Sequence, residues 1–409
     1  MKNEGNDVVM VSACRTAIGK YGGTLKDVKP MELMKLTATE AIKRAGIEPA
    51  MVDELVLGMA MTAGQGSSPP RICAMEIGMD PRSSASSVNQ NCASSMRALD
   101  VAIMKLAMGQ TQIAVVSGTE CQSSVPYLLP NMRWGARLND TKCLDPLQID
   151  GMYDSVAQAH MGYTAETVAE MYDITREECD ELALISHRRT ARATDEGRFK
   201  SQIVPVEINT RKGIQVFDQD ENFMRDTNIE KLGKLPAVFK KGGVVTAGNA
   251  SSLNDASSAV VLMTKKKADE LGLKPLMKCI NVVTEGVRPE VMGLGPAVAI
   301  PKALKEAGMK YGDVDYWEIN EAFASQIIGC FRKIKEEQGI DMDFGTLERD
   351  GNINNNGSGI GLGHPVGQTG LRLVIALYYE LERLGKTTGG ASLCVGGGAA
   401  MASLWTRDI

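Results

Sequence analysis

The amino-acid sequence predicts an α/β protein made of two duplicated halves, each with a mostly parallel sheet covered by helices, and a long segment inserted between them. Residues 41–60 and 303–322 align without a gap, and seven of the twenty aligned positions are identical. Both stretches have the pattern of an amphipathic helix that ends at a glycine, followed by a short loop and an apolar strand. Strands that alternate with helices are typical of sheets covered by helices.

The order of predicted elements continues in parallel through both halves. In the first half, Val88-Asn89 leads to a helix from about 94 to 109 and then to a strand over 113–116. In the second half, Ile353-Asn354 leads to a helix from about 369 to 384 and then to a strand over 391–395. One repeated stretch could be coincidence, but a matching order of elements indicates duplication.

The middle of the chain, roughly residues 121–249, does not follow this alternation of strands and helices. It holds Pro126, Pro130, a predicted helical run from Glu166 to Thr194 and the acidic stretch 218–221. We expect an insertion that lies over the two halves and carries substrate contacts, because binding residues are frequent on such connections. The predicted division is 1–122 plus 250–272 for the N-terminal half, 123–249 for the inserted loop domain and 273–409 for the C-terminal half.

Composition limits the classes of function. A chain of 409 residues suggests two or three domains, at about 150 residues per domain. The hydrophobic content of 44% and charged content of 23% are ordinary for a soluble enzyme. The apolar runs, such as 113–116, are strand-sized, so we expect no membrane span. The net charge of −5 argues against a nucleic-acid partner. Neither end shows a targeting signal, which predicts a cytoplasmic protein.

The nine cysteines include no Cys-x-x-Cys pair, which argues against a disulfide framework and against a structural zinc site. We therefore expect no metal. The glycines at 357, 359, 361 and 363 do not have the G-x-G-x-x-G spacing, so they form no dinucleotide-binding fingerprint.

Two cysteines and one of the three histidines are the candidates for chemistry. Cys92 precedes a predicted helix, whose dipole should lower the pKa of the thiol; the alternative is a cysteine that only packs at a helix start. His364 follows a glycine-rich stretch that predicts a tight turn, and its alternative role is a structural hydrogen bond. Cys394 ends an apolar strand. His187, in a helical run, is expected on the surface. Two thiols and an imidazole at such junctions suggest covalent acyl transfer.

Five blocks, in order along essentially the whole chain, resemble the thiolase family of acetyl-CoA acetyltransferases and 3-oxoacyl-CoA thiolases. The blocks are Val88-Asn89 with Cys92-Ala93-Ser94, His160-Met161-Gly162, residues 246–251 (TAGNAS), residues 320–324 (NEAFA), and Gly363-His364-Pro365 with residues 394–398 (CVGGG). The resemblance implies the thiolase fold: five layers, αβαβα, from two duplicated halves, with an inserted loop domain.

The resemblance also implies a role for each member of the catalytic set. Cys92 is similar to the nucleophile that forms an acyl-enzyme, and His364 to the group that takes the thiol proton and helps to bind the thioester oxygen. Asn320 would hold a water in the same oxyanion site, and Cys394 would move the α-proton of acetyl-CoA. The backbone amides of Cys92 and Gly396 would stabilise a second oxyanion. Removal of a weakly acidic α-proton requires such a base and such preorganised donors.

Further positions resemble residues of the binding site, although plain core packing is an open alternative for several of them. Ser251 is similar to a serine that contacts the pantetheine arm, and Arg225 lies where the family contacts the CoA phosphates. Tyr163, Gln368 and the pair Met224-Arg225 depart from the common pattern and bear on acyl-chain preference and CoA contacts. The remaining expected substrate contacts are His160, Met161, Met292 and Phe323.

The implied function is reversible, CoA-dependent cleavage of a 3-oxoacyl-CoA to acetyl-CoA, or another short acyl-CoA, plus an acyl-CoA, or the reverse Claisen condensation. The block at 160–162 favours an acetoacetyl-CoA-type substrate. Coenzyme A would be a substrate, with no permanently bound cofactor. We expect an enzyme of fatty acid or acyl-CoA metabolism that forms a homodimer or homotetramer and works with or without a small accessory subunit, and we expect no nucleic acid and no membrane among its partners.

Three alternatives compete with this interpretation. A degradative thiolase would act on longer, branched, dicarboxylic or aromatic 3-oxoacyl-CoA esters. A decarboxylating or hydroxymethylglutaryl-type condensing enzyme would lack the second cysteine, so Cys394 argues against it. A non-catalytic acyl-CoA-binding scaffold should have lost at least one of Cys92, Asn320, His364 and Cys394, and the sequence keeps all four.

Overall fold

The structure, a computed structural model, describes residues 7–409. Eleven strands form its central mixed sheet. Nine of them follow one path in the order β13 (Tyr316–Ile319), β14 (Thr388–Val395), β15 (Ala399–Thr406), β12 (Met277–Gly286), β1 (Val8–Thr16), β11 (Asn254–Thr264), β5 (Ile113–Cys121), β3 (Glu54–Gly58) and β4 (Ser84–Val88). The short strands β2 (Gly19–Lys20) and β8 (Ile203–Val204) pair with β11 and β1.

The strand path is symmetric about its centre, which confirms the predicted duplication. On one side lie β1, β11, β5 and β3, and on the other lie β12, β15, β14 and β13, joined where β1 pairs with β12. The helices that precede β3 and β13 also match: α1 (Pro30–Ala45) and α8 (Gly295–Ala307) both end at a left-handed glycine, Gly46 with φ 70° and Gly308 with φ 68°. A residue without a Cβ is favoured at such a helix end.

The two halves also share a side-chain contact at identical positions of the repeat. The Asp53 carboxylate accepts the backbone N–H groups of Gln112 and Ile113, each at 2.9 Å, at the start of β5. The Asp315 carboxylate accepts those of residues 387 and 388, at 3.0 and 2.9 Å, at the start of β14. Both aspartates thus satisfy backbone donors at the start of the neighbouring strand, which explains why the repeat carries an aspartate there.

The expectation of mostly parallel half-sheets was wrong. β3 is parallel to β4 and β5, and β13 is parallel to β14, but the central pairs are antiparallel. The inserted segment leaves β5 and re-enters β11 at the same end of the sheet, where Cys121 pairs with Asp255. In the other half β14 turns directly into β15 through residues 396–398. Both connections return to the end of the sheet that they leave, so the strands that they join are antiparallel.

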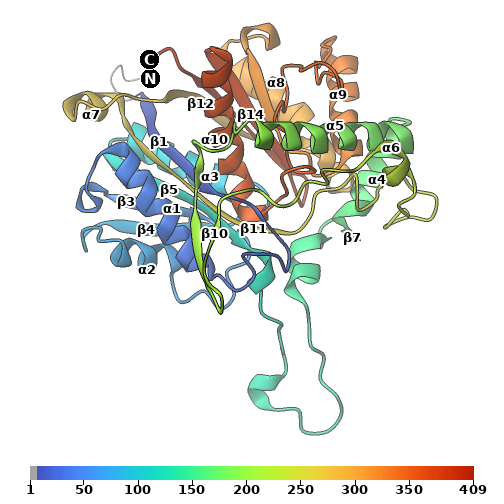
Figure 1. Ribbon diagram of the computed structural model, residues 1–409, viewed down its shortest axis with the longest axis horizontal. Helices are drawn as coiled ribbons and strands as arrows, with labels where there is room; N and C mark the ends of the chain where they lie inside the picture. Colours follow the sequence, from blue (N-terminus) through green and yellow to red (C-terminus); the bar gives the residue numbers. More distant parts are fainter. Residues whose placement is uncertain (1–6) are drawn as a thin grey trace.

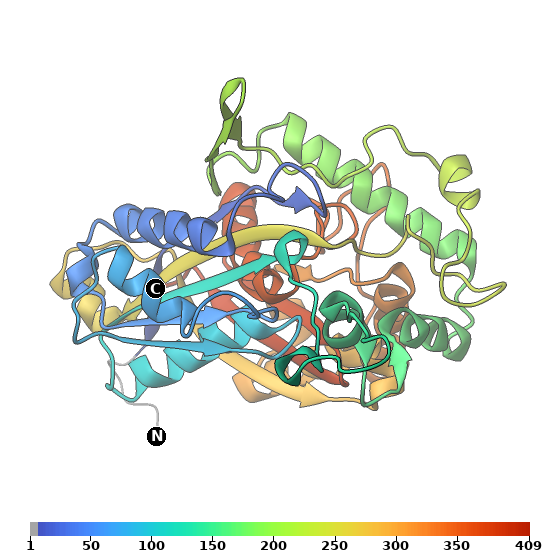
Figure 2. The same cartoon turned by 90° about the horizontal axis from the view of Figure 1, so that it is seen from below.

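The helices arrange the halves into five layers (Figures 1 and 2). α3 (Ser94–Ala107) and α10 (Val366–Leu384) pack on each other in the middle layer, in a core that combines residues of both halves. α1 and α2 (Pro69–Glu76) cover one outer face, and α8 with α9 (Ala324–Gln338) covers the other. The middle layer therefore brings the start of α3 and the start of α10 together, one from each half.

The inserted segment contains two long helices and otherwise only short elements. Its predicted helical run is in fact two helices, α4 (Met161–Met171) and α5 (Arg176–Asp195). The break arises because Asp173 takes a left-handed conformation and Thr175 starts α5 with a capping box to Glu178. The stretch between β5 and β7 projects from the body (Figure 1). Its other elements are η2 (Gln122–Ser124), η3 (Met132–Trp134), η4 (Leu147–Met152), β6 (Tyr153–Asp154), β7 (Ala159–His160), β9 (Val206–Thr210), β10 (Gly213–Phe217) and α6 (Ile229–Gly233).

The remaining elements are η1 (Pro49–Met51), α7 (Lys265–Glu270), η5 (Pro289–Leu294) and η6 (Tyr311–Asp313). Among the helices of residues 7–409, none has the length and apolar character needed to cross a bilayer.

Candidate active site

An apolar cavity of about 140 Å³ opens where the two halves and the inserted segment meet. It receives residues from the loops that follow β4 and β13, from the last residues of β14 and β7, from the stretch before β11 and from the turn before α10. Most of the predicted site residues line it. They are Cys92, His160, Met161, Ser251, Met292, Phe323, His364 and Cys394.

Cys92 lies in the loop between β4 and α3 and is 6% exposed. Burial raises the pKa of its thiol to about 11, although the backbone N–H groups of Gly396 and of Cys92 itself donate to the sulfur and lower it. The expected lowering below the ordinary value was therefore wrong, because desolvation of the thiolate outweighs its hydrogen bonds. Helix α3 begins two residues later, at Ser94.

His364 stands just before α10, and residues 353–365 are all buried, as the tight turn required. Its Nδ1 lies 2.6 Å from Thr369 Oγ1, and that hydroxyl donates to the Pro365 carbonyl at 3.0 Å. Since a hydroxyl has one proton, Nδ1–H donates to Oγ1 and Nε2 keeps its lone pair. Nε2 has no hydrogen-bond partner among the described residues. Burial, together with the positive charge of Arg372, lowers the pKa of His364 to about 3. The ring is therefore a neutral base.

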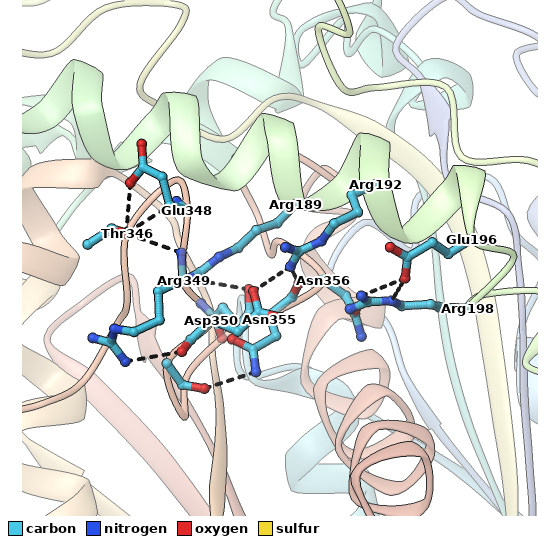
Figure 3. Close-up of polar contacts among 12 residues, drawn as sticks. Arg189, Arg192, Glu196, Arg198, Thr346, Glu348, Arg349, Asp350, Asn355 and Asn356 are labelled. Carbon is cyan, nitrogen blue, oxygen red and sulfur yellow. Dashed lines mark hydrogen bonds and ion pairs between the residues drawn. The ribbon is translucent and has the colours of Figure 1, made fainter.

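The loop before His364 is held in place by α5 of the inserted segment. Arg192 of α5 forms an ion pair with Asp350 (Figure 3). Arg198 lies just beyond α5, and its Nη1 donates to Asn356 Oδ1 at 2.9 Å. A Cβ at Gly357 or Gly361 would lie 2.1 or 2.3 Å from Thr190 Oγ1 on α5. Such distances are impossible, so glycine is required for the loop to pack on the helix.

Cys394 is the penultimate residue of β14 and is fully buried. Burial, with Cys92 nearby, raises the pKa of the Cys394 thiol well above its usual value. Gly396 follows in the turn, and its N–H reaches the sulfur of Cys92. The site thus holds two protonated thiols and one neutral imidazole, and a proton that moves from a thiol to the imidazole leaves the net charge of the site unchanged.

Asn320 is fully buried directly after β13 and lies behind the cavity rather than in its wall. Its Oδ1 accepts a hydrogen bond from Arg372 Nη2 at 3.2 Å, and its Nδ2 has no partner within residues 7–409. A Cβ at Gly359 would lie 2.8 Å from Asn320 Oδ1, so the amide sits against the loop that carries His364. A buried donor without a partner is suited to hold a water.

The structure does not place Arg225 at the cavity. Its guanidinium forms a surface ion pair with Asp195, with Nη1–Oδ2 at 2.8 Å, and stacks over the ring of Phe223. Arg225 lies in the loop after the acidic stretch, several residues from any element that reaches the cavity. Its side chain is about half exposed and able to meet an anion from solvent.

Sequence reasoning missed several residues of the site. Phe239 lines the cavity and packs on the ring of His160, with 4.6 Å between ring centroids. Glu120 is buried, and its carboxylate accepts the N–H groups of Ala60, Met61 and Gly367 at 2.9 to 3.2 Å. Glu120 therefore ties the loop after β3 to the start of α10. It lies in the last part of β5, and nothing in its spacing distinguished it.

His187 also departs from expectation, because it is 3% exposed rather than on the surface. Burial lowers its pKa to about 4, and its Nδ1 accepts the N–H of Met224 at 3.3 Å. Both His187 and its partner Met224 belong to the inserted segment, so this segment itself covers the ring. Within the described part of the chain, no group of three or more His, Cys, Asp or Glu side chains could hold a metal ion.

Comparison with known proteins agrees with this geometry. Residues 8–266 match the family model for the thiolase N-terminal domain, and residues 273–407 match that for the thiolase C-terminal domain. The chain belongs to the thiolase family. The two matched regions meet between β11 and β12, at the point where the structure passes from one duplicated half to the other.

Relatives of this thiolase match it along nearly its whole length. An acetyl-CoA acetyltransferase of Syntrophomonas wolfei is 43% identical over 97% of this chain and 98% of its own. The structure of an acetyl-CoA acetyltransferase from Syntrophomonas wolfei superposes with a TM-score of 0.96 at 55% identity, covering 98% of this chain and 100% of that one. Human mitochondrial 3-ketoacyl-CoA thiolase in complex with CoA superposes with a TM-score of 0.91 at 33% identity, covering 98% of both chains. The predicted five-layered thiolase fold is confirmed.

Proposed function

We propose that this thiolase, an acyltransferase, interconverts acetoacetyl-CoA plus CoA with two molecules of acetyl-CoA through an acyl-enzyme on Cys92. The observation that carries the proposal is the convergence of Cys92, the free Nε2 of His364 and Cys394 on one small apolar cavity. A nucleophile, a neutral base and a second proton carrier are the groups that reversible thioester exchange and Claisen chemistry require.

The first half-reaction cleaves the 3-oxoacyl-CoA. His364 Nε2 takes the proton of the Cys92 thiol as the sulfur attacks the 3-oxo carbon. The carbonyl electrons move to oxygen, which accepts hydrogen bonds from the amides of Cys92 and Gly396. When the bond between carbons 2 and 3 breaks, Cys92 keeps the acetyl group and carbon 2 takes a proton from Cys394. Acetyl-CoA then leaves.

The second half-reaction transfers the acyl group. The Cys394 thiolate takes the proton of the incoming CoA thiol, and the CoA sulfur attacks the acetyl carbon on Cys92. The Cys92 thiolate leaves and recovers its proton from the His364 imidazolium. Both thiols and the imidazole are then in their starting, uncharged protonation states, which are the states that burial favours. In the condensing direction Cys394 removes the α-proton, while a water held by Asn320 and the His364 ring stabilises the enolate oxygen.

The size of the cavity supports a short acyl group. An apolar protein cavity of about 150 Å³ holds benzene, which has as many non-hydrogen atoms as an acetoacetyl group. The cavity here is about 140 Å³, and Met161, Met292 and Phe323 supply apolar walls. Longer, branched or aromatic chains would have to displace these side chains.

The coenzyme is expected to enter between the inserted segment and the N-terminal half. Ser251 lines the cavity and would meet the pantetheine arm, and its backbone N–H donates to the Ala322 carbonyl at 2.9 Å, which joins two walls of the cavity. Arg225 would meet the CoA phosphates at the surface, exchanging its partner Asp195 for a more highly charged anion.

The proposal extends to the organisation of the protein. We assign residues 1–122 plus 250–272 to the N-terminal half, 123–249 to the inserted loop domain and 273–409 to the C-terminal half. We also propose a cytoplasmic protein that forms a homodimer or homotetramer, with or without a small accessory subunit. The assembly is supported by the exposed Trp134 and Leu138 on the projecting stretch, which a partner subunit would cover. Light scattering after size exclusion measures the mass that tests this point.

The deciding experiment follows CoA-dependent cleavage of acetoacetyl-CoA beside a 3-oxooctanoyl-CoA, in the wild type, Cys92→Ala and Cys143→Ala. Cys143 is the exposed free cysteine of the projecting stretch, so it is the matched control for loss of a thiol. The wild type and Cys143→Ala should cleave acetoacetyl-CoA much faster than the longer ester, and Cys92→Ala should be inactive. Activity retained by Cys92→Ala would refute the acyl-enzyme, and preference for the longer ester would refute the short-chain assignment.

A second variant separates proton transfer at carbon from thioester exchange. Cys394→Ala should slow the formation of an acetyl-Cys92 peptide from acetyl-CoA, detected by mass spectrometry, much less than it slows condensation of two acetyl groups, because a thiolate leaves more readily without an acid than a weakly acidic α-proton is removed without a base. Condensation at the wild-type rate in Cys394→Ala would place Cys394 outside the proton transfer proposed for it.

A further inference from the structure

The peptide that joins Gly396 to Gly397 is held at both ends by side chains from distant parts of the chain. Asn91 Nδ2 donates to the Gly396 carbonyl at 3.1 Å across 305 positions of sequence. The Gly397 N–H donates to Asp154 Oδ2 at 2.7 Å across 243 positions. The carbonyl and the N–H belong to one planar peptide unit, so the two side chains hydrogen-bond to both polar groups of the same rigid plane.

This peptide needs an external restraint. Glycines flank it on both sides, and Gly397 and Gly398 have φ values of 89° and 88°. With no Cβ on either side, the plane can turn over at little steric cost. A turned plane would point the Gly396 carbonyl at the Asp154 carboxylate and the Gly397 N–H at the Asn91 amide hydrogens. Both contacts would become repulsive, so the two side chains select one orientation.

Both side chains are themselves fixed. Asp154 is 3% exposed, and its Oδ1 accepts the N–H groups of Val156 and Ala157 at 2.8 and 3.1 Å. Asn91 has a φ of 46°, a left-handed conformation that asparagine tolerates better than most side chains, and its N–H donates to Asn89 Oδ1 at 3.0 Å.

The restrained peptide is next to the reacting sulfur. The orientation of the Gly396–Gly397 plane sets ψ of Gly396, and the Gly396 N–H on the preceding plane donates to the sulfur of Cys92. Asn91 directly precedes Cys92 in the chain. One hydrogen-bonded unit therefore joins the nucleophile loop of the first half, the turn of the second half and the inserted segment.

We propose that Asn91 and Asp154 are positioning residues that clamp the Gly396–Gly397 peptide and so aim the Gly396 amide at the sulfur of Cys92. The inference rests on the proposed function, in which this amide serves the thiolate and the oxyanion. Asn91 supplies the donor and Asp154 the acceptor, and the clamp closes only when the inserted segment lies on the site.

The test is the rate at which iodoacetamide alkylates Cys92 at pH 8, followed on the Cys92 peptide by mass spectrometry, in wild type, Asn91→Gly and Asp154→Asn. A weaker hydrogen bond from Gly396 raises the pKa of the thiol. Each unit by which the thiol pKa increases slows alkylation about threefold at fixed pH, because a tenfold loss of thiolate is partly offset by greater nucleophilicity. We expect both variants to react at least threefold more slowly, and kcat for acetoacetyl-CoA cleavage to fall about tenfold or more with KM within about threefold.

The two substitutions separate the clamp from simple electrostatics and from chain flexibility. Removal of the Asp154 charge by itself would favour the thiolate and speed alkylation, whereas a loosened clamp slows it. The other titratable groups around the sulfur, Glu120, His364 and Cys394, are unchanged in both variants. Asn139→Gly is the control for Asn91→Gly, because Asn139 is an exposed asparagine that also has a positive φ, of 85°.

An alkylation rate equal to or above that of the wild type in either folded variant overturns the clamp, and so does equal slowing by Asn139→Gly. Asp154→Asn keeps the test decisive if Asn91→Gly does not fold. The outcomes also separate this inference from the function itself. An active wild type with unchanged variants removes the clamp and leaves the thiolase reaction, while the alkylation rates test the clamp even in a protein that cleaves no 3-oxoacyl-CoA.

Discussion

Acidification gives the most direct test of the site, because the chain has only three histidines and the structure buries two of them. Burial lowers the pKa of His364 to about 3 and that of His187 to about 4. His160 is about half buried, and burial lowers its pKa less. We therefore predict that His160 takes up a proton first as the pH falls and that the other two stay neutral at pH 5.

The magnitude follows from the difference between the folded and unfolded states. A pKa of about 3 against an ordinary 6.5 means that charging His364 in the folded site costs about 5 kcal/mol. Because its folded pKa is depressed, His364 stabilises the fold fully above pH 6.5, and this stability is lost as the pH falls from 6.5 towards 3. At pH 5 the loss is about 2 kcal/mol.

The assay is NMR of protein labelled with carbon-13 in the histidine rings, recorded between pH 8 and pH 4.5. Three ring resonances are expected, and His160→Gln and His187→Gln assign them by removal. The resonance of His364 should not move above pH 5, so the acid limb of kcat/KM should not report an imidazole with an ordinary pKa. A His364 midpoint near 6.5 would refute both the neutral base and the burial argument that predicts it.

Two further predictions concern neighbours of the catalytic groups. Burial raises the pKa of Glu120 to about 7, so its contribution to stability is present below about pH 4.5 and is lost as the pH rises through 7. In denaturant unfolding, the wild type should lose about 3 kcal/mol between pH 4.5 and 8 relative to Glu120→Gln. The same dependence of stability on pH in both proteins would contradict this. In Gly162→Ala the new Cβ would lie 2.2 Å from the ring of Phe239, which lines the cavity and would have to move. We expect a loss of about 1–3 kcal/mol of stability. If the ring moves into the cavity, kcat/KM for acetoacetyl-CoA should fall at least tenfold, and unchanged kinetics would show that it moves elsewhere.

Helices whose positions depend on neighbouring residues in the sequence could be predicted well. The helices around 94–109 and 369–384 were found with ends within a few residues of α3 and α10, because apolar periodicity and terminal glycines act over short distances. The prediction of a single helical run in the inserted segment was wrong because one left-handed residue, Asp173, interrupts an otherwise continuous helical pattern. The expected parallel sheet was wrong because strand direction depends on where a long connection returns.

Protonation could not be predicted from the sequence. The start of a helix next to Cys92 suggested a lowered thiol pKa, but burial raises it, and burial depends on what the rest of the chain packs over the sulfur. His187 shows the same limitation: its polar neighbours in the sequence indicated a surface residue, but the loop that carries Met224 covers it. Glu120 and Asp154 had no sequence signal at all, since their partners lie far along the chain.

The sequence by itself determined that this chain is a duplicated α/β protein with Cys92, His364 and Cys394 at strand and helix junctions, because repeats, glycine positions and apolar periods are properties of neighbouring residues. Only the tertiary structure decided that these three side chains share one cavity of about 140 Å³, that the imidazole is neutral, and that Asn91 and Asp154 hold one peptide between them. The physical reason is that desolvation and hydrogen-bond geometry depend on residues brought together by folding across hundreds of positions, about which local pattern carries no information.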